Sequence, residues 1–227
     1  MDAHVDGAAV ALAAGVGLIT APYLARLTLS VPDREHARWW TGRPASPKRT
    51  AVTALVAVVF GALAGAAAGW TALLPAFLAL ALITTPLVPI DLEHHRLPNR
   101  LTFLAGGAAA ALLTLAAAID GDWHAWLRGL EGAAAVYAVL FVIMVIASFG
   151  FGDVKLGGVL GAYLGWFSWS AVYYGMLAGF VVGAVVAVGL LAAKRATRKT
   201  AIAFGPWMTL GALLVLAFDL VPNLQAG

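Results

Sequence analysis

The sequence predicts an all-α polytopic membrane protein with about eight transmembrane helices and with its N-terminus and C-terminus outside. Hydrophobic residues make up 62% of the chain and charged residues only 11%, whereas soluble domains are about half apolar and about a quarter charged. Apolar runs of about 15 to 22 residues recur along the chain, and about 20 such residues cross a bilayer core. Basic residues gather in the loops between these runs, as the positive-inside bias predicts.

The predicted spans follow one another as a single membrane-embedded domain, residues 1–227. They lie near 7–28, 51–68, 71–90, 101–119, 130–149, 155–169, 171–193 and 204–222. The first is expected to be a true span rather than a cleaved signal peptide, because no basic residue precedes its apolar stretch.

Short polar segments separate these spans. Residues 29–50 contain several Pro and Arg residues and form a cytoplasmic loop too short for a catalytic domain, so any chemistry belongs to the membrane body. Residues 119–126 are predicted to form an outer turn with tryptophan anchors. The apolar stretch 154–193 is too long for one span, so we expect it to break at the aromatic cluster 165–169. Glycines throughout this half predict close helix packing.

The distribution of positive charge predicts the orientation. With the N-terminus outside, 13 of the 14 basic residues fall in inside segments, and only Arg128 lies outside. This uneven split supports both the eight-span count and the orientation. Asp91, after the third span, and Asp153, before the sixth, then share the cytoplasmic face. The expected location is the cytoplasmic (inner) membrane.

Asp91 and Asp153 are the predicted catalytic residues. Each stands where a long apolar run meets water, in a chain with only 11 acidic residues. A carboxyl pair hydrolyses a peptide bond when the ionised member takes a proton from water and the protonated member polarises the carbonyl. Two close carboxyl groups suit both roles, since their like charges favour sharing a proton. The sequence therefore predicts a protease that acts beside the bilayer.

The residues next to Asp153 are interpreted as shaping the site. Gly150 and Gly152 remove side-chain bulk and permit positive φ, which would let a peptide approach the backbone closely. Lys155 is expected to hold the site electrostatically or to meet lipid phosphate.

The loop after Asp91 has a similar interpretation. Pro98 ends the loop, and Asn99 is expected to cap the helix that follows. Residues 93–95 are Glu-His-His, which could suggest a metal site, but adjacent histidines without spaced partners are more typical of a solvated loop. We expect no metal and no cofactor.

Simpler interpretations stay open for the other charged groups and for the pair itself. A lone Asp at a membrane boundary is usually a solvated residue or a helix cap, although two such sites on one face favour catalysis. Glu131 and Asp219 are interpreted as caps or interfacial groups, and the basic residues of 194–199 as a lipid-facing cluster. Without cysteine, disulfides, thiolate zinc sites and a Cys nucleophile are excluded. The basic loops require no nucleic-acid partner.

Three segments resemble the type IV prepilin peptidases, which are aspartic membrane proteases of the Gly-x-Gly-Asp group. The first is Ile90-Asp91, followed seven residues later by Pro98. The second is 150–156, which matches Gly-x-Gly-Asp-x-Lys-Leu in full. The third is 204–207, Phe-Gly-Pro-Trp. The resemblance extends from residue 50 to residue 222.

This resemblance implies that Asp91 and Asp153 form the catalytic dyad. Such enzymes remove the short basic leader of prepilins or pseudopilins on the cytoplasmic side, just before an apolar helix, in pilus, competence or secretion pathways. Many bacterial members also carry a methyltransferase region with a Cys-x-x-Cys pair. This chain has no cysteine and only a short loop after its first span, so peptidase activity without N-methylation is expected.

Two other functions are weighed against this one. Intramembrane proteases of the presenilin or signal-peptide-peptidase type share Gly-x-Gly-Asp but usually show Tyr-Asp and Pro-Ala-Leu, where this chain has Ile90-Asp91 and Gly205-Pro206-Trp207. A proton-coupled transporter would usually place its carboxylates near the bilayer midplane, whereas both aspartates lie at span ends.

Overall fold

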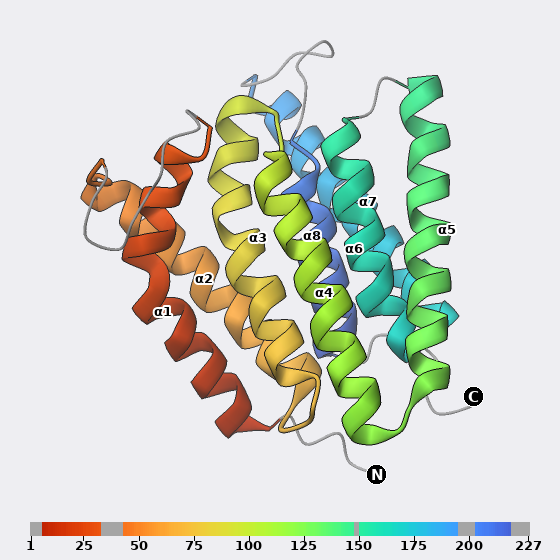
Figure 1. The fold of residues 1–227 in the computed structure, drawn as a ribbon. Coiled ribbons are helices and arrows are strands. Elements are labelled where there is room, and N and C mark those ends of the chain that lie inside the picture. Colours follow the sequence, from red (N-terminus) through yellow and green to blue (C-terminus); the bar gives the residue numbers. More distant parts are fainter. Residues whose placement is uncertain (1–5, 33–42, 148–149, 195–202, 219–227) are drawn as a thin grey trace.

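The structure, a computed structural model, describes residues 6–32, 43–147, 150–194 and 203–218. The prediction of an all-α protein is confirmed, since these residues form helices and contain no strand. The helices are α1 (Gly7–Ser30), α2 (Pro47–Ala68), α3 (Leu74–His94), α4 (Asn99–Asp120), α5 (Trp123–Ala147), α6 (Phe151–Phe167), α7 (Trp169–Ala192) and α8 (Gly205–Ala217). They run side by side as one bundle (Figure 1).

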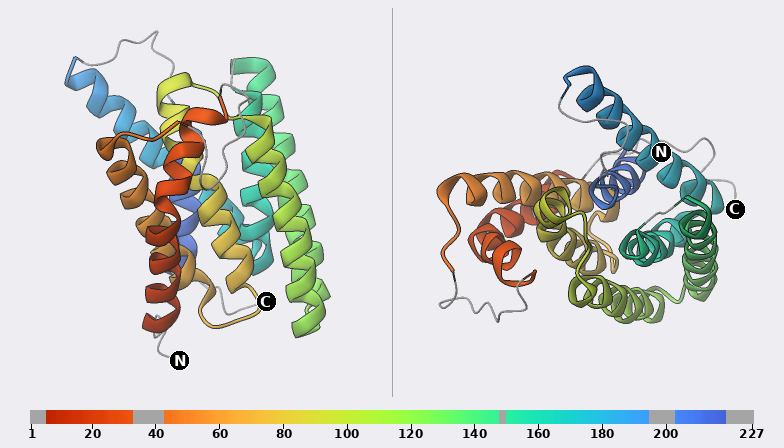
Figure 2. Two further views of the ribbon diagram at one scale, coloured as in Figure 1. Left: turned by 60° about the vertical axis from the view of Figure 1, so that its left-hand side comes forward. Right: turned by 90° about the horizontal axis from the view of Figure 1, so that it is seen from above.

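Helix length separates the eight helices into two groups. Among the described residues, α1 to α5 and α7 are long and apolar enough to cross a membrane, so the chain is a multi-pass membrane protein. The other two are shorter: α6 has 17 residues and the described part of α8 has 13. Both lie among the longer helices, with α8 near the middle of the bundle (Figure 2).

The predicted break inside 154–193 is confirmed. Helix α6 ends at Phe167, and Ser168 is extended there. The Ser168 side chain accepts a hydrogen bond of 2.9 Å from the N–H of Ala171 and so caps α7.

Close helix contacts in this half rest on glycine, as the sequence predicts. A Cβ added at Gly161 of α6 would lie 2.5 Å from the carbonyl oxygen of Gly132 in α5, and the reverse substitution is equally close at 2.6 Å. Because backbone meets backbone here, neither residue has room for a side chain.

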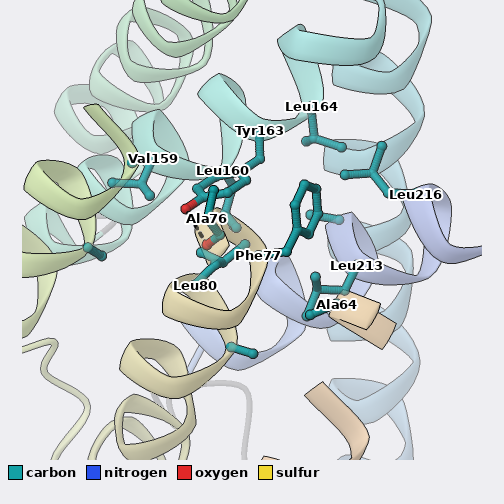
Figure 3. Packing of buried hydrophobic residues seen from close by; sticks show 14 of the residues in the cluster. Ala64, Ala76, Phe77, Leu80, Val159, Leu160, Tyr163, Leu164, Leu213 and Leu216 are labelled. Carbon is teal, nitrogen blue, oxygen red and sulfur yellow. Dashed lines mark hydrogen bonds between the residues drawn. The ribbon is translucent and has the colours of Figure 1, made fainter. Parts of the chain in front are cut away.

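A buried aromatic cluster joins α3 to α6 and α8 in the centre of the bundle. The rings of Phe77 and Tyr163 meet edge to face, 5.1 Å apart, and the Tyr163 hydroxyl donates a 2.8 Å hydrogen bond to the carbonyl of Ala76. Leu213 of α8 lies beside them (Figure 3). This packing fixes α3, α6 and α8 relative to one another, and their ends form the site described below.

The end of α3 is shaped by local backbone effects. Pro86 and Pro89 lie inside the helix, where each removes one backbone donor. The helix stops at His94, because His95 takes a left-handed conformation with φ of 49°. The N–H of His95 donates to the carbonyl of Asp91 at 2.8 Å, so the aspartate occupies the last turn.

Candidate active site

Asp91 is a buried carboxylate in the last turn of α3. The residue is only 3% exposed. It is therefore not a solvated loop residue, which was the simpler interpretation. The N–H of Gly205, the first residue of α8, donates to Asp91 Oδ2 at 3.2 Å. A hydrogen bond of this kind favours the ionised form of the acceptor. Residues 114 positions apart in the chain therefore meet at this oxygen.

Asp153 lies in the first turn of α6, where neighbouring glycines leave little free space. Gly150 is the N-cap of the helix, and a Cβ at Gly150 would lie 2.7 Å from Asp153 Oδ2. A Cβ at Gly152 would lie 2.7 Å from Cβ of Leu97 in the neighbouring loop. A side chain at either position would therefore collide with its neighbour. Neither glycine uses the positive φ that its residue type permits, since only Gly69 and Gly121 have it among the described glycines.

The two carboxyl groups line one cavity of about 740 Å³ at the end of the bundle where α3 ends and α6 begins. Pro98, Gly150 and Gly152 line the same cavity. Two carboxyl groups that line one cavity disfavour each other's ionisation, because their charges are alike.

The two carboxyl groups differ in their hydrogen bonding. Asp153 Oδ1 is buried, and no described residue donates to it or accepts from it. Buried polar oxygens are normally paired. A carboxyl oxygen in this state, beside a second carboxylate, is suited to bind the proton or the water that the pair would share.

Lys155 does not line this cavity. Its Nζ donates to Asn99 Oδ1 at 2.8 Å and lies 4.7 Å and 4.5 Å from the ring centroids of Phe103 and Phe151. The lysine therefore joins α6 to the start of α4 beside the dyad. The expectation that Asn99 caps α4 is wrong by one residue, because Pro98 is the N-cap and makes no side-chain hydrogen bond.

Glu93 also has a partner that the sequence did not indicate. It lies in α3 and accepts two hydrogen bonds, of 2.7 and 2.8 Å, from the guanidinium of Arg49 in α2. Arg49 donates in addition to Thr28 of α1. His94 and His95 line the dyad cavity, and no group of three possible metal ligands occurs among the described residues.

The type IV leader peptidase family matches residues 76–188, a segment that includes both aspartates and most of the residues that line their cavity. The chain belongs to this family. Its similarity to members extends beyond the matched segment. A prepilin leader peptidase/N-methyltransferase of Aeromonas hydrophila is 31% identical over 194 residues, which are 78% of this chain and 63% of the relative.

Two further relatives of the present chain carry the same description. That of Legionella pneumophila is 30% identical over 59% of this chain and 46% of its own length. That of Pseudomonas aeruginosa is 29% identical over 56% of this chain and 43% of its own length. The chain spans about half the length of the curated relatives it matches. No solved structure matches it.

Gly205 is the site residue that the sequence interpretation left without a role. The available signal was the segment 204–207, which contributed to the family resemblance. The contact between Gly205 and Asp91 depends on where α8 begins relative to the end of α3. No local sequence pattern specifies the position of one helix relative to another. Glu131 lies on α5 as an exposed residue, while Asp219 and positions 195–199 of the basic cluster fall outside the described residues.

Proposed function

We propose that the protein is a membrane aspartic endopeptidase that removes the N-terminal leader of type IV prepilin-like or pseudopilin precursors. The observation that carries the proposal is the single cavity lined by Asp91 and Asp153. The family and the printed names of the relatives support a prepilin substrate. The carboxylates belong to helix ends, which argues against a transporter with a site at the bilayer midplane.

The unlike surroundings of the two carboxyl groups support distinct roles. Asp91 receives the N–H of Gly205 and serves as the ionised base. Asp153 has a buried oxygen without a donor among the described residues and serves as the protonated acid. Protonation removes the charge that this environment stabilises poorly.

Hydrolysis then proceeds without a covalent intermediate. Asp91 takes a proton from water while the water oxygen attacks the carbonyl carbon of the substrate, and Asp153 gives its proton to the carbonyl oxygen. When the resulting diol collapses, it returns a proton to Asp153, and Asp91 protonates the leaving nitrogen as the C–N bond breaks. Both side chains end in their starting states, ready for another cycle.

We infer that the protein lies in the cytoplasmic (inner) membrane and that the cavity faces the cytoplasm. Arg96 and Arg100 line the cavity, and positive side chains are enriched on the cytoplasmic side of membrane proteins. N-methyltransferase activity is not expected, because the chain contains no cysteine for the pair found in members that methylate.

Purified protein mixed with a prepilin tests this function by mass spectrometry of the products. We expect two fragments, with the cut just before the apolar helix, and an unmethylated new N-terminus when S-adenosylmethionine is supplied. An intact precursor would contradict the peptidase proposal. A methylated product would contradict only the expectation about methylation.

A further inference from the structure

A second hollow lies against the dyad cavity, on the other side of Lys155. It is an apolar groove of about 550 Å³ between α4, α5 and α6. We infer that this groove binds the apolar helix of the substrate, the segment that follows the bond to be cut. The inference rests on the proposed function and extends it from the reacting bond to the remainder of the substrate.

The groove and the dyad cavity adjoin each other at Lys155, although they share no lining residue. Phe103 and Lys155 line the groove, whereas Asn99 and Phe151 line the cavity. The Lys155 ammonium contacts Asn99 and both aromatic rings. An extended peptide that leaves the carboxyl pair past this cluster reaches the groove, so one ligand can occupy both hollows.

The shape of the groove suits a ligand that enters from the dyad end. Helices α4 and α5 meet at their shared loop and diverge toward the end that carries the dyad (Figure 1). At the closed end, Nε1 of Trp126 donates to Oγ1 of Thr114 at 2.8 Å. Along α6 the groove extends from Lys155 to Trp166, which is about 16 Å, or three helical turns.

The lining suits an apolar helix more closely than a polar ligand. Glycine and alanine predominate on the α4 side, and a Cβ added at Gly107 would meet nothing within 4 Å. Small residues let a second helix approach the backbone closely. Among the residues that line the groove, Lys155 alone carries a formal charge, and it lies at the dyad end. A ligand that is apolar within the membrane and polar near the dyad matches this pattern.

Filling the groove tests the inference. In Gly107→Phe the new ring projects into the groove, and Gly189→Phe is a matched control because Gly189 of α7 also has nothing within 4 Å of its added Cβ. We would measure kcat/KM for a full-length precursor and for a peptide that keeps the bond to be cut and a few residues after it but lacks the rest of the apolar helix. The kcat/KM of the full-length precursor divided by that of the truncated peptide should fall about tenfold in Gly107→Phe. In Gly189→Phe this ratio should keep its wild-type value.

An unchanged ratio in Gly107→Phe, in an enzyme that still cleaves, would overturn the inference. If the wild-type protein cleaved neither substrate, the proposed function itself would fail, and the two failures are thereby distinguishable.

Cross-linking gives a second readout that does not depend on tolerance of a large side chain. The chain has no cysteine, so Ala110→Cys in the groove and Val185→Cys on the exposed face of α7 each introduce a single thiol. A substrate with one cysteine in its apolar helix should form a disulfide with Ala110→Cys and not with Val185→Cys. Equal yields, no substrate adduct during active cleavage, or adducts only between two enzyme copies would each contradict substrate binding in the groove.

Discussion

Asp91 and Asp153 have the same side chain but different environments. Asp91 is almost fully buried and accepts a hydrogen bond from the N–H of Gly205. Asp153 presents a buried oxygen that no described group contacts through a hydrogen bond. Because Asp91 Oδ2 has a donor and Asp153 Oδ1 has none among the described residues, we propose that Asp91 is the carboxylate and Asp153 the carboxylic acid.

Chemical labelling distinguishes the acid from the base. A carboxylate opens an epoxide, whereas a protonated carboxyl group is esterified by a diazo compound. We expect an epoxide reagent to modify Asp91 and a diazoacetyl reagent to modify Asp153, with the modified residue located by mass spectrometry of the wild-type protein. The reverse pattern would mean that the two roles are exchanged.

The pH dependence of kcat follows from the shared proton. At low pH both carboxyl groups are protonated and no base is left, so the rate should rise as pH increases through the first deprotonation. At higher pH both are ionised and no acid is left, so the rate should fall through the second. Steady-state cleavage across pH should give a bell-shaped profile. A rate that changes in one direction only would contradict the shared-proton mechanism.

At this scale the sequence indicated two candidate carboxyl groups, which the structure places in one cavity, but it did not indicate the groups around them. Asp91 and Asp153 were predicted because each follows a recognisable local pattern at a span end. The donor from Gly205 was not, because it depends on residues 114 positions apart. Asn99 was taken for the cap because its side chain suits that position, but Pro98 occupies the extended N-cap and Asn99 pairs with Lys155 instead.

Helix α6 shows how a short helix can end inside a bundle of longer ones. The last carbonyl groups of a helix lack intrahelical donors, and water is scarce near a membrane core. Here the Arg128 side chain of α5 donates to the carbonyls of Gly165, Trp166 and Phe167. The only basic residue predicted outside is therefore a cap for the helix that carries Asp153.

Removing this cap should destabilise the protein. In Arg128→Ala three carbonyl groups lose a charged donor, and we expect the free energy of unfolding in detergent to fall by about 2–3 kcal/mol. His124→Ala, which changes an exposed residue of the same helix, serves as the control and should leave stability near wild type. If Arg128→Ala unfolded at the same temperature as the control, the cap would contribute nothing to stability.

The elements themselves were largely predictable, since apolar run length and interruptions define helices well in this chain. The break at Ser168 was expected because the apolar stretch was too long for one span. The lengths of α6 and α8 relative to the bilayer depend on tertiary contacts, such as the Arg128 cap. Such contacts cannot be predicted from the length of an apolar run.

At the scale of the whole molecule, both candidate catalytic carboxyl groups lie at one end of the bundle. The end of α3 and the beginnings of α6 and α8 meet there, while the aromatic cluster around Tyr163 fixes the three helices deeper in the bundle. The apolar groove leads away from the same point. Under the proposed function, the polar cavity holds the reacting bond and the apolar groove holds the membrane part of the substrate.

The absence of native cysteine makes the orientation directly measurable. We expect a membrane-impermeant maleimide to label His124→Cys in intact cells and to label Arg100→Cys only after permeabilisation, because the dyad end should face the cytoplasm. Both positions are exposed. Labelling of Arg100→Cys in intact cells would reverse the orientation.

The most direct test of the dyad is cleavage of a co-expressed prepilin by wild type, Asp91→Asn and Asp153→Asn at matched membrane abundance. These substitutions remove ionisation with almost no change in volume. Asp122→Asn is the control, because Asp122 caps α5 at the opposite end of the bundle and Asn can replace it there. We predict that wild type and Asp122→Asn remove the leader while both dyad variants accumulate intact precursor. Normal cleavage by either dyad variant would contradict the proposed mechanism.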